Sequence, residues 1–178
     1  MIFRTTPLDG AYTIELERRQ DARGYFARAF CAREFADRGL ETEFVQANLS
    51  VNAQAGLVRG MHFQAGDDAE VKLVRCVRGA IFDAIVDIRA GSPTHLQWFG
   101  AELSEDNGLM MYVPRGFAHG YQSIAEGTMV HYMVSAFYAP DAERGLRHDD
   151  PMIGIDWPRP VTDLSEKDRA WPLLERRE

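Results

Sequence analysis

Short segments rich in β-branched and aromatic residues follow one another from about residue 44 to residue 136, separated by Gly, Pro, Asn, Asp or Ser. This pattern is typical of an antiparallel sandwich or barrel, in which every strand turns back after a few residues. We predict an all-β fold with strands over residues 11–17, 23–29, 44–51, 57–63, 71–78, 80–88, 96–103, 109–114, 119–124 and 128–136. Gly79 is expected to make a hairpin turn. A helix is expected over 32–39, ended by Gly39, and one helical turn over 164–168.

The chain has 178 residues, of which 46% are hydrophobic, enough for one substantial core but too few for two comfortable domains. One domain over 1–178 is therefore expected. After residue 140 the pairs Trp157-Pro158 and Trp171-Pro172 interrupt regular structure. Because this part has too few apolar residues to fold alone, segment 140–178 is expected to pack on the barrel as an irregular tail. Such a tail brings charged residues back to the barrel mouth.

The charge of the chain argues against two classes of partner. Its formal net charge is -7 and its pI about 5.3, so neither nucleic acid nor an anionic membrane would be attracted broadly. A local basic pocket is still compatible with this balance. The first residues show no basic stretch leading into an apolar run, and no segment approaches the ~20 apolar residues of a membrane span. We expect a cytoplasmic protein.

The spacing of cysteine and histidine gives no metal motif. Cys31 and Cys76 lie in separate segments, without the close pairing of a zinc site or a redox dithiol. A metal-binding barrel would place two histidines at alternate positions of one strand, followed by a carboxylate. His62 is instead followed by Phe63 and Gln64. We therefore expect no metal and no cofactor, against the alternative of a metal-dependent cupin dioxygenase or isomerase.

The chain has 18 Arg and only 2 Lys, which draws attention to the lysines. Strand alternation places Lys72 with Val74 and Cys76 on an apolar face. An ammonium group on such a face loses its hydration unless an anion compensates it. A functional role is therefore more plausible for Lys72 than for a surface lysine.

A histidine or tyrosine on a strand is more often structural than catalytic, and His62, His119 and Tyr132 are each open to that interpretation. Their combination with a lysine and several arginines is more informative. Removal of a proton from carbon next to a carbonyl needs a base, cationic donors for the enolate oxygen and an acid on the opposite face. Histidine, lysine or arginine, and tyrosine suit these roles in turn.

Seven segments carry a resemblance to a known family over roughly residues 9–175. In order and spacing they resemble the dTDP-4-dehydrorhamnose 3,5-epimerases: 21–26 (DARGYF), 44–48 (FVQAN), 58–64 (VRGMHFQ), 72–75 (KLVR), 113–120 (VPRGFAHG), 154–158 (GIDWP) and 164–168 (LSEKD). The resemblance implies a jelly-roll (cupin-like) barrel with short helices and an irregular C-terminal segment. It also implies a homodimer that epimerises a nucleotide-linked 4-keto-6-deoxyhexose.

Carried over by position, the resemblance implies that His62 is the base, with Asp168 as its partner, and that Tyr132 is the acid. Lys72 would hold the enolate oxygen. The implied substrate contacts are Arg23, Phe26, Gln46, Asn48, Arg59, His119, Tyr138, Glu143 and Lys167. Of these, Arg23 and Phe26 would reach the nucleotide of the partner subunit, and Tyr138 would lie near the nucleotide.

The sequence departs from the family pattern at Arg28, Met133 and His148, where the family usually has a glutamate, a lysine, and a tryptophan or tyrosine. These departures leave His62, Tyr132 and Asp168 intact but leave the nucleotide base and the sugar open. Two alternatives to the 3,5-epimerase follow. One is an epimerase that inverts a single carbon, and the other is a jelly-roll protein that binds a nucleotide sugar without turning it over.

Overall fold

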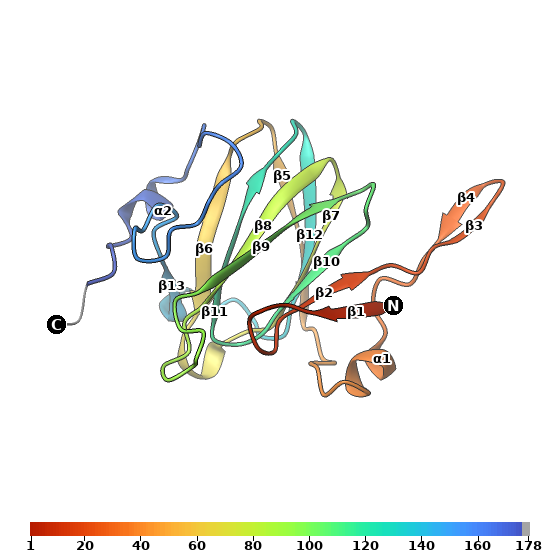
Figure 1. The fold of residues 1–178 in the computed structure, drawn as a ribbon, viewed down its shortest axis with the longest axis horizontal. Helices are drawn as coiled ribbons and strands as arrows, with labels where there is room; N and C mark the ends of the chain where they lie inside the picture. The colour runs from red at the N-terminus through yellow and green to blue at the C-terminus, as the bar shows by residue number, and fades with distance from the viewer. Residues whose placement is uncertain (176–178) are drawn as a thin grey trace.

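Two antiparallel β-sheets packed face to face form the body of the protein in the computed structural model, which describes residues 1–175 (Figure 1). The larger sheet contains, in spatial order, β1 (Ile2–Thr5), β2 (Tyr12–Glu15), β10 (Met110–Val113), β7 (Lys72–Arg78), β12 (Thr128–Val134) and β5 (Gln46–Asn52). The smaller contains β13 (Glu143–Gly145), β6 (Val58–Gln64), β11 (Phe117–Ser123), β8 (Ala80–Asp87) and β9 (Trp98–Ser104). The strand pattern predicts such an antiparallel sandwich, and the family resemblance implies the jelly-roll (cupin-like) fold that is observed.

Each predicted strand overlaps an observed one, whereas β1, β13 and β3 (Arg19–Asp21) were not predicted. β3 and β13 have three residues each, too few to show alternation. The expected early helix is α1 (Ala32–Ala36), and Gly39 follows it at φ 67°. The expected helical turn begins two residues later than predicted, as α2 (Glu166–Ala170). Single 3-10 turns occur at Gly66–Asp68 and Pro140–Ala142.

The prediction that Gly79 forms a hairpin is wrong. Gly79 does adopt a positive φ of 75°, but the strands before and after it lie in different sheets. β7 pairs with β10 and β12, and β8 pairs with β9 and β11. The turn therefore carries the chain across the sandwich, which local turn chemistry does not distinguish from a hairpin.

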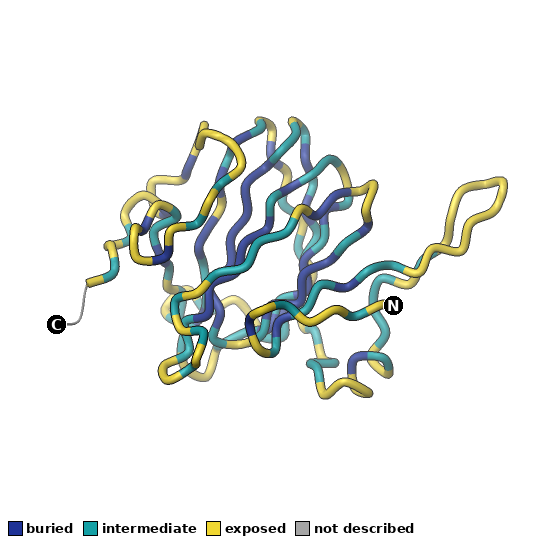
Figure 2. Tube along the Cα trace, viewed as in Figure 1, coloured by how far each residue is buried: buried dark blue, intermediate teal, exposed yellow. Residues whose placement is uncertain are grey.

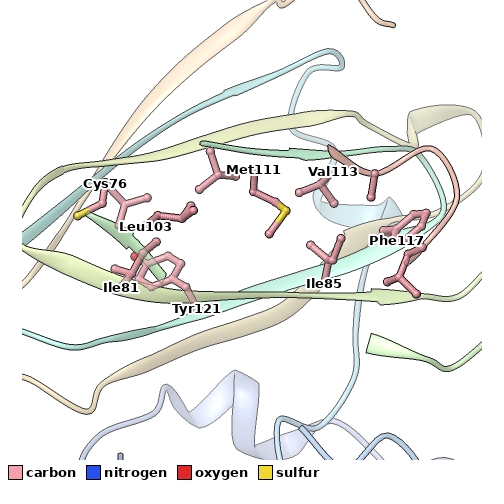
Figure 3. Close-up of a cluster of buried hydrophobic side chains, with 12 residues drawn as sticks. Cys76, Ile81, Ile85, Leu103, Met111, Val113, Phe117 and Tyr121 are labelled. Atoms are coloured by element: carbon pink, nitrogen blue, oxygen red, sulfur yellow. The ribbon is translucent and has the colours of Figure 1, made fainter. Parts of the chain in front are cut away.

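The core lies between the two sheets, where inward-facing residues of both meet (Figure 3). Cys76 and Met111 come from the larger sheet, and Ile81, Ile85 and Leu103 from the smaller. All five are at most 2% exposed. The alternation of each strand supplies these residues, and their burial removes apolar surface from water, the main favourable term in folding.

Two parts of the chain extend beyond the sandwich (Figures 1 and 2). β3 and β4 (Gly24–Phe26) form a separate exposed hairpin that projects from one end. After residue 140 the chain returns to the smaller sheet through β13 and an isolated bridge between Leu57 and Asp163. Residues 176–178 of the predicted tail lie outside the described residues. Within residues 1–175 no helix is long and apolar enough to span a membrane.

β6 and β11 approach so closely at one point that neither strand has room for a side chain. A Cβ on Gly60 would lie 2.5 Å from the Cα of Gly120, and Gly60 has a φ of 130°. The regular pairing of the two strands is interrupted at this point, between His119 and Tyr121. Beside this contact the ladder pairs His62 with His119. The two glycines thus allow β6 and β11 to approach closely beside the pair formed by His62 and His119.

We predict that Gly60→Ala lowers the free energy of unfolding by about 2–4 kcal/mol, since it adds overpacking to an unfavourable backbone conformation. Gly24→Ala is the matched control, because Gly24 has a φ of 125° and, among residues 1–175, only its own chain neighbours lie within 4 Å of its Cβ position. The control substitution should lower the free energy of unfolding by only about 1–2 kcal/mol. Urea denaturation measures both, and equal losses would mean that the close contact contributes nothing.

Candidate active site

Two adjoining cavities open between the sheets and share three lining residues: His62, Lys72 and Tyr132. The first cavity has a volume of about 430 Å³ and the second about 370 Å³. His62 lies on β6 of the smaller sheet, whereas Lys72 and Tyr132 lie on β7 and β12 of the larger. Groups from both sheets therefore face a common space.

The imidazole of His62 is hydrogen-bonded to a carboxylate from the tail. His62 Nε2 lies 2.5 Å from Asp168 Oδ1, although the two residues are 106 positions apart. Ser165 caps α2 by accepting a hydrogen bond from the Asp168 amide, at 3.1 Å. The amide of Gly60 lies 3.5 Å from the second carboxylate oxygen. The helix cap and the strand together fix the carboxylate behind the imidazole.

Asp168 is held in its charged form although it is only 3% exposed. Burial by itself raises the pKa of this carboxyl group, but the hydrogen bond and the charge of His62 outweigh burial and bring the pKa below its usual value. A buried carboxylate beside an imidazole fixes the tautomer of the ring and stabilises the imidazolium. His62 is therefore equipped to accept a proton.

Tyr132 presents a phenol that stays protonated near neutral pH. Burial raises the pKa of this hydroxyl, partly offset by the nearby charge of Arg59. β12 holds the residue between Asn48 of β5 and Val74 of β7. A protonated phenol in this setting can donate a proton to a group in the cavity.

Lys72 is largely enclosed, as the alternation of β7 predicts, and its ammonium group is compensated. Its Nζ lies 3.1 Å from Glu70 Oε1 and donates a hydrogen bond to the carbonyl oxygen of His62, at 3.2 Å. The side chain of Lys72 is 12% exposed and that of Glu70 7%. The cation is therefore fixed beside His62, where it can stabilise negative charge on an oxygen atom in the cavity.

A second histidine–carboxylate pair lies next to the first. His119 Nε2 is 2.7 Å from Oδ1 of Asp83, which is fully buried on β8. Tyr121 and Ser50 complete this wall, and their hydroxyl oxygens lie 2.8 Å apart. Four residues at the site were not predicted from the sequence: Asp83, Ser50, Tyr121 and Glu70. Asp83 could have been found as a carboxylate within the otherwise apolar run of residues 80–88, where it needs a buried partner. Glu70 lies two residues before Lys72, so strand alternation places both on the same face.

The second cavity contains four of the remaining predicted contacts: Gln46, Asn48, Tyr138 and Glu143. Glu143 links Tyr138 to Lys167 of the tail. It accepts a hydrogen bond from the Tyr138 hydroxyl at 2.7 Å, and its carboxylate lies 2.5 Å from Lys167 Nζ. Burial raises the pKa of Glu143, but contact with Lys167 and Tyr138 outweighs burial, so the pKa lies below its usual value. These contacts also tie the tail to the rim of the cavity.

Cationic side chains gather at the first cavity despite the acidic composition of the chain. Arg59, Lys72 and Lys167 line it beside His62 and His119. Arg59 is exposed, and Asn52 holds it by accepting a hydrogen bond from its Nε at 2.8 Å. A guanidinium group presented in this way matches the oxygen atoms of a phosphate.

Arg23 and Phe26 are not brought to either cavity. Both lie on the projecting β3–β4 hairpin, where Arg23 pairs with Asp21 at 2.6 Å and Phe26 is 65% exposed. For metals, the described residues contain no group of three or more His, Cys, Asp or Glu side chains arranged to hold an ion.

A cupin-like jelly roll with a carboxylate-backed histidine and a partly buried tyrosine facing one cavity defines an acid–base isomerase. The chain belongs to the dTDP-4-dehydrorhamnose 3,5-epimerase family, whose model matches residues 5–176. This membership confirms the resemblance seen in the sequence.

Individual relatives cover nearly the whole chain. A dTDP-4-dehydrorhamnose 3,5-epimerase of Sinorhizobium fredii is 45% identical over 98% of this chain and 90% of its own. A dTDP-4-dehydrorhamnose 3-epimerase of Streptomyces niveus is 38% identical over 98% of this chain and 84% of its own.

Solved structures agree with these sequence relatives. The 3,5-epimerase of Elizabethkingia anophelis superposes with a TM-score of 0.94 at 39% identity, covering 97% of this chain and 96% of its own. The enzyme of Legionella pneumophila, solved in complex with dTDP-4-keto-L-rhamnose, gives a TM-score of 0.91 at 37% identity. The match covers 97% of this chain and 92% of the Legionella chain.

The lowered pKa of Asp168 predicts a pH-dependent contribution to stability. The contribution is present above the ordinary carboxyl pKa of about 4 and is lost as the pH falls through the lower pKa of the folded state. We expect Asp168→Asn to lower the free energy of unfolding by about 1–3 kcal/mol at pH 7. Between about pH 5 and pH 3, the difference from wild type should shrink.

Urea denaturation at several pH values measures this difference, with Asp141→Asn as the control because Asp141 is exposed and its side chain receives no hydrogen bond from a described residue. A gap between wild type and Asp168→Asn that is constant from about pH 5 to pH 3 would contradict the assigned pairing.

Proposed function

We propose that the protein converts dTDP-4-dehydro-6-deoxyglucose to dTDP-4-dehydrorhamnose by inverting carbons 3 and 5. The observation that carries the proposal is that His62, backed by Asp168, and Tyr132 come from opposite sheets and line the same cavity. The relatives support the substrate class, since most are named for this reaction and one was solved with a dTDP-keto sugar.

The reaction begins at a carbon next to the ketone at carbon 4. The ketone makes the hydrogens on carbons 3 and 5 acidic, because the electron pair left behind moves onto the carbonyl oxygen as an enolate. His62 takes the proton, and Asp168 stabilises the resulting imidazolium. Lys72 donates a hydrogen bond to the enolate oxygen. The charge developed in the step is thus compensated at both ends.

Inversion requires that the new proton arrive on the opposite face of the sugar ring. Tyr132 supplies this proton, since its raised pKa keeps the hydroxyl protonated near neutral pH. The phenolate left behind is a strong base, and it recovers a proton from solvent while His62 releases one. Each inversion therefore consumes and produces no net proton.

The remaining lining residues hold the rest of the substrate. Arg59 and Lys167 bind diphosphate oxygens, and His119 contacts the sugar. Gln46, Asn48 and Glu143 hold the substrate in the second cavity, and Tyr138, whose ring is 61% exposed, packs near the nucleotide. No cofactor takes part in this scheme. The proposal includes a single domain over the whole chain and a cytoplasmic location.

The proposed assembly is a homodimer. β5 is the edge strand of the larger sheet, and its outward residues include Leu49 and Val51, which are 65% and 54% exposed. Burying such an apolar strand against a second copy removes that surface from water and protects an open edge. The projecting hairpin would then place Arg23 and Phe26 at the partner's nucleotide.

We predict that Leu49→Glu shifts the protein from dimer to monomer in sedimentation velocity, because it buries a charge in the proposed interface. Leu173→Glu is the matched control, since Leu173 is also half exposed but lies on the tail. The control should sediment as wild type. A wild type that is monomeric at all concentrations would contradict the dimer.

For the reaction itself, we predict that the substrate incubated in deuterated water gains deuterium at carbons 3 and 5. His62→Ala should abolish uptake at both carbons, because nothing else removes the proton. Tyr132→Phe should reduce inversion more than exchange, since His62 can return a deuteron to the face it deprotonated. NMR and mass spectrometry measure both.

Each other outcome has a specific meaning. Uptake at one carbon only would make the protein a single-centre epimerase, as the Streptomyces niveus relative is named. No uptake with any 4-keto nucleotide sugar would favour a binding protein. Equal and mild effects of the two variants would overturn the assigned roles.

A further inference from the structure

Glu70 is a buried carboxylate at the site that the scheme above leaves without a role. It lies two residues before Lys72, lines the second cavity and has a side chain that is only 7% exposed. Its Oε1 lies 3.1 Å from Lys72 Nζ. Its Oε2 is fully enclosed, and no group in residues 1–175 donates a hydrogen bond to it.

An enclosed carboxylate oxygen without a donor costs free energy, and such groups in folded proteins usually have a partner. Lys72 compensates the charge but leaves this second oxygen unsatisfied. The amide nitrogen of Gln64, a donor in the same cavity, is already engaged, since it donates hydrogen bonds to the carbonyl oxygens of Asp68 at 2.9 Å and Phe137 at 3.2 Å. Because Glu70 lines the second cavity, a molecule bound there can bring the missing donor.

The proposed substrate limits what that donor can be. In a nucleotide-linked 4-keto-6-deoxyhexose, carbon 1 carries the nucleotide, carbon 4 the ketone, carbon 5 the ring oxygen and carbon 6 only hydrogen. Free hydroxyls remain on carbons 2 and 3. If Lys72 holds the oxygen on carbon 4, the hydroxyl nearest to Lys72 is the one on the adjacent carbon 3.

We infer that Glu70 is a substrate-binding residue whose carboxylate accepts a hydrogen bond from the hydroxyl on carbon 3 while it holds Lys72. This inference rests on the proposed function. The negative charge of Glu70 also contributes to the raised pKa of Tyr132, consistent with a carboxylate that faces the same space as the acid. Glu70 would therefore recognise the hydroxyl at one of the two carbons that change configuration.

The test compares substrates within each variant, so that general damage to the site cancels. The rate of deuterium uptake at carbon 5 is measured as kcat/KM for the parent sugar nucleotide and its 3-deoxy and 2-deoxy analogues. In wild type, kcat/KM for the 3-deoxy analogue should be about 10- to 100-fold lower than for the parent, because a hydrogen bond to a charged group is removed. In Glu70→Met, which keeps the size but no oxygen, this loss should shrink to about 3-fold or less.

Glu70→Gln keeps an oxygen for Lys72 and should show an intermediate loss, and it also serves if Glu70→Met does not fold. The ratio for the 2-deoxy analogue should be the same in all three proteins. The inference is overturned if the 3-deoxy loss is absent in wild type, unchanged in the variants, or found with the 2-deoxy analogue instead. Failure of wild type to exchange either carbon of the parent contradicts the proposed function itself.

Discussion

The hydrogen bond between His62 and Asp168 is the contact on which the rest of the site depends. It joins a strand of the smaller sheet to a helix in the tail, and the carboxylate is shielded from water while the imidazole stays partly exposed to the cavity. A helix of five residues has little stability of its own, so Ser165, the bridge between Leu57 and Asp163, and the packing of Trp171 against Gly145 have to hold it in place. The tail therefore forms part of the wall of the first cavity.

Two facing sheets can place side chains on both sides of a bound ligand, which a single sheet cannot do. Inversion needs a base and an acid on opposite faces of one ring, and the two facing sheets bring the proposed pair, His62 of β6 and Tyr132 of β12, to one cavity. The same arrangement lets an acidic protein bind an anionic ligand. Arg59, Lys72 and Lys167 act over a few ångströms inside the site, where the net charge of the surface has little influence.

Much of this could be predicted from the sequence. Alternation along β7 indicated that Lys72 is enclosed, and the run of short strands indicated the fold. What could not be predicted is where distant residues meet: that Asp83 lies behind His119, and that Gly79 leads into the other sheet rather than a hairpin. Pairing between segments far apart is decided by tertiary packing, which local patterns do not contain. The family resemblance supplied Asp168, which spacing alone would not have joined to His62.

The position of Asp168 along the chain has a consequence for biosynthesis. This carboxylate follows every strand of both sheets, and a ribosome builds the protein from its amino end. The nascent polypeptide can close its sandwich and bury its apolar residues while the imidazole still lacks its partner. A chain that ended just before Asp168 would contain every strand of both sheets, yet it would lack the carboxylate with which His62 pairs.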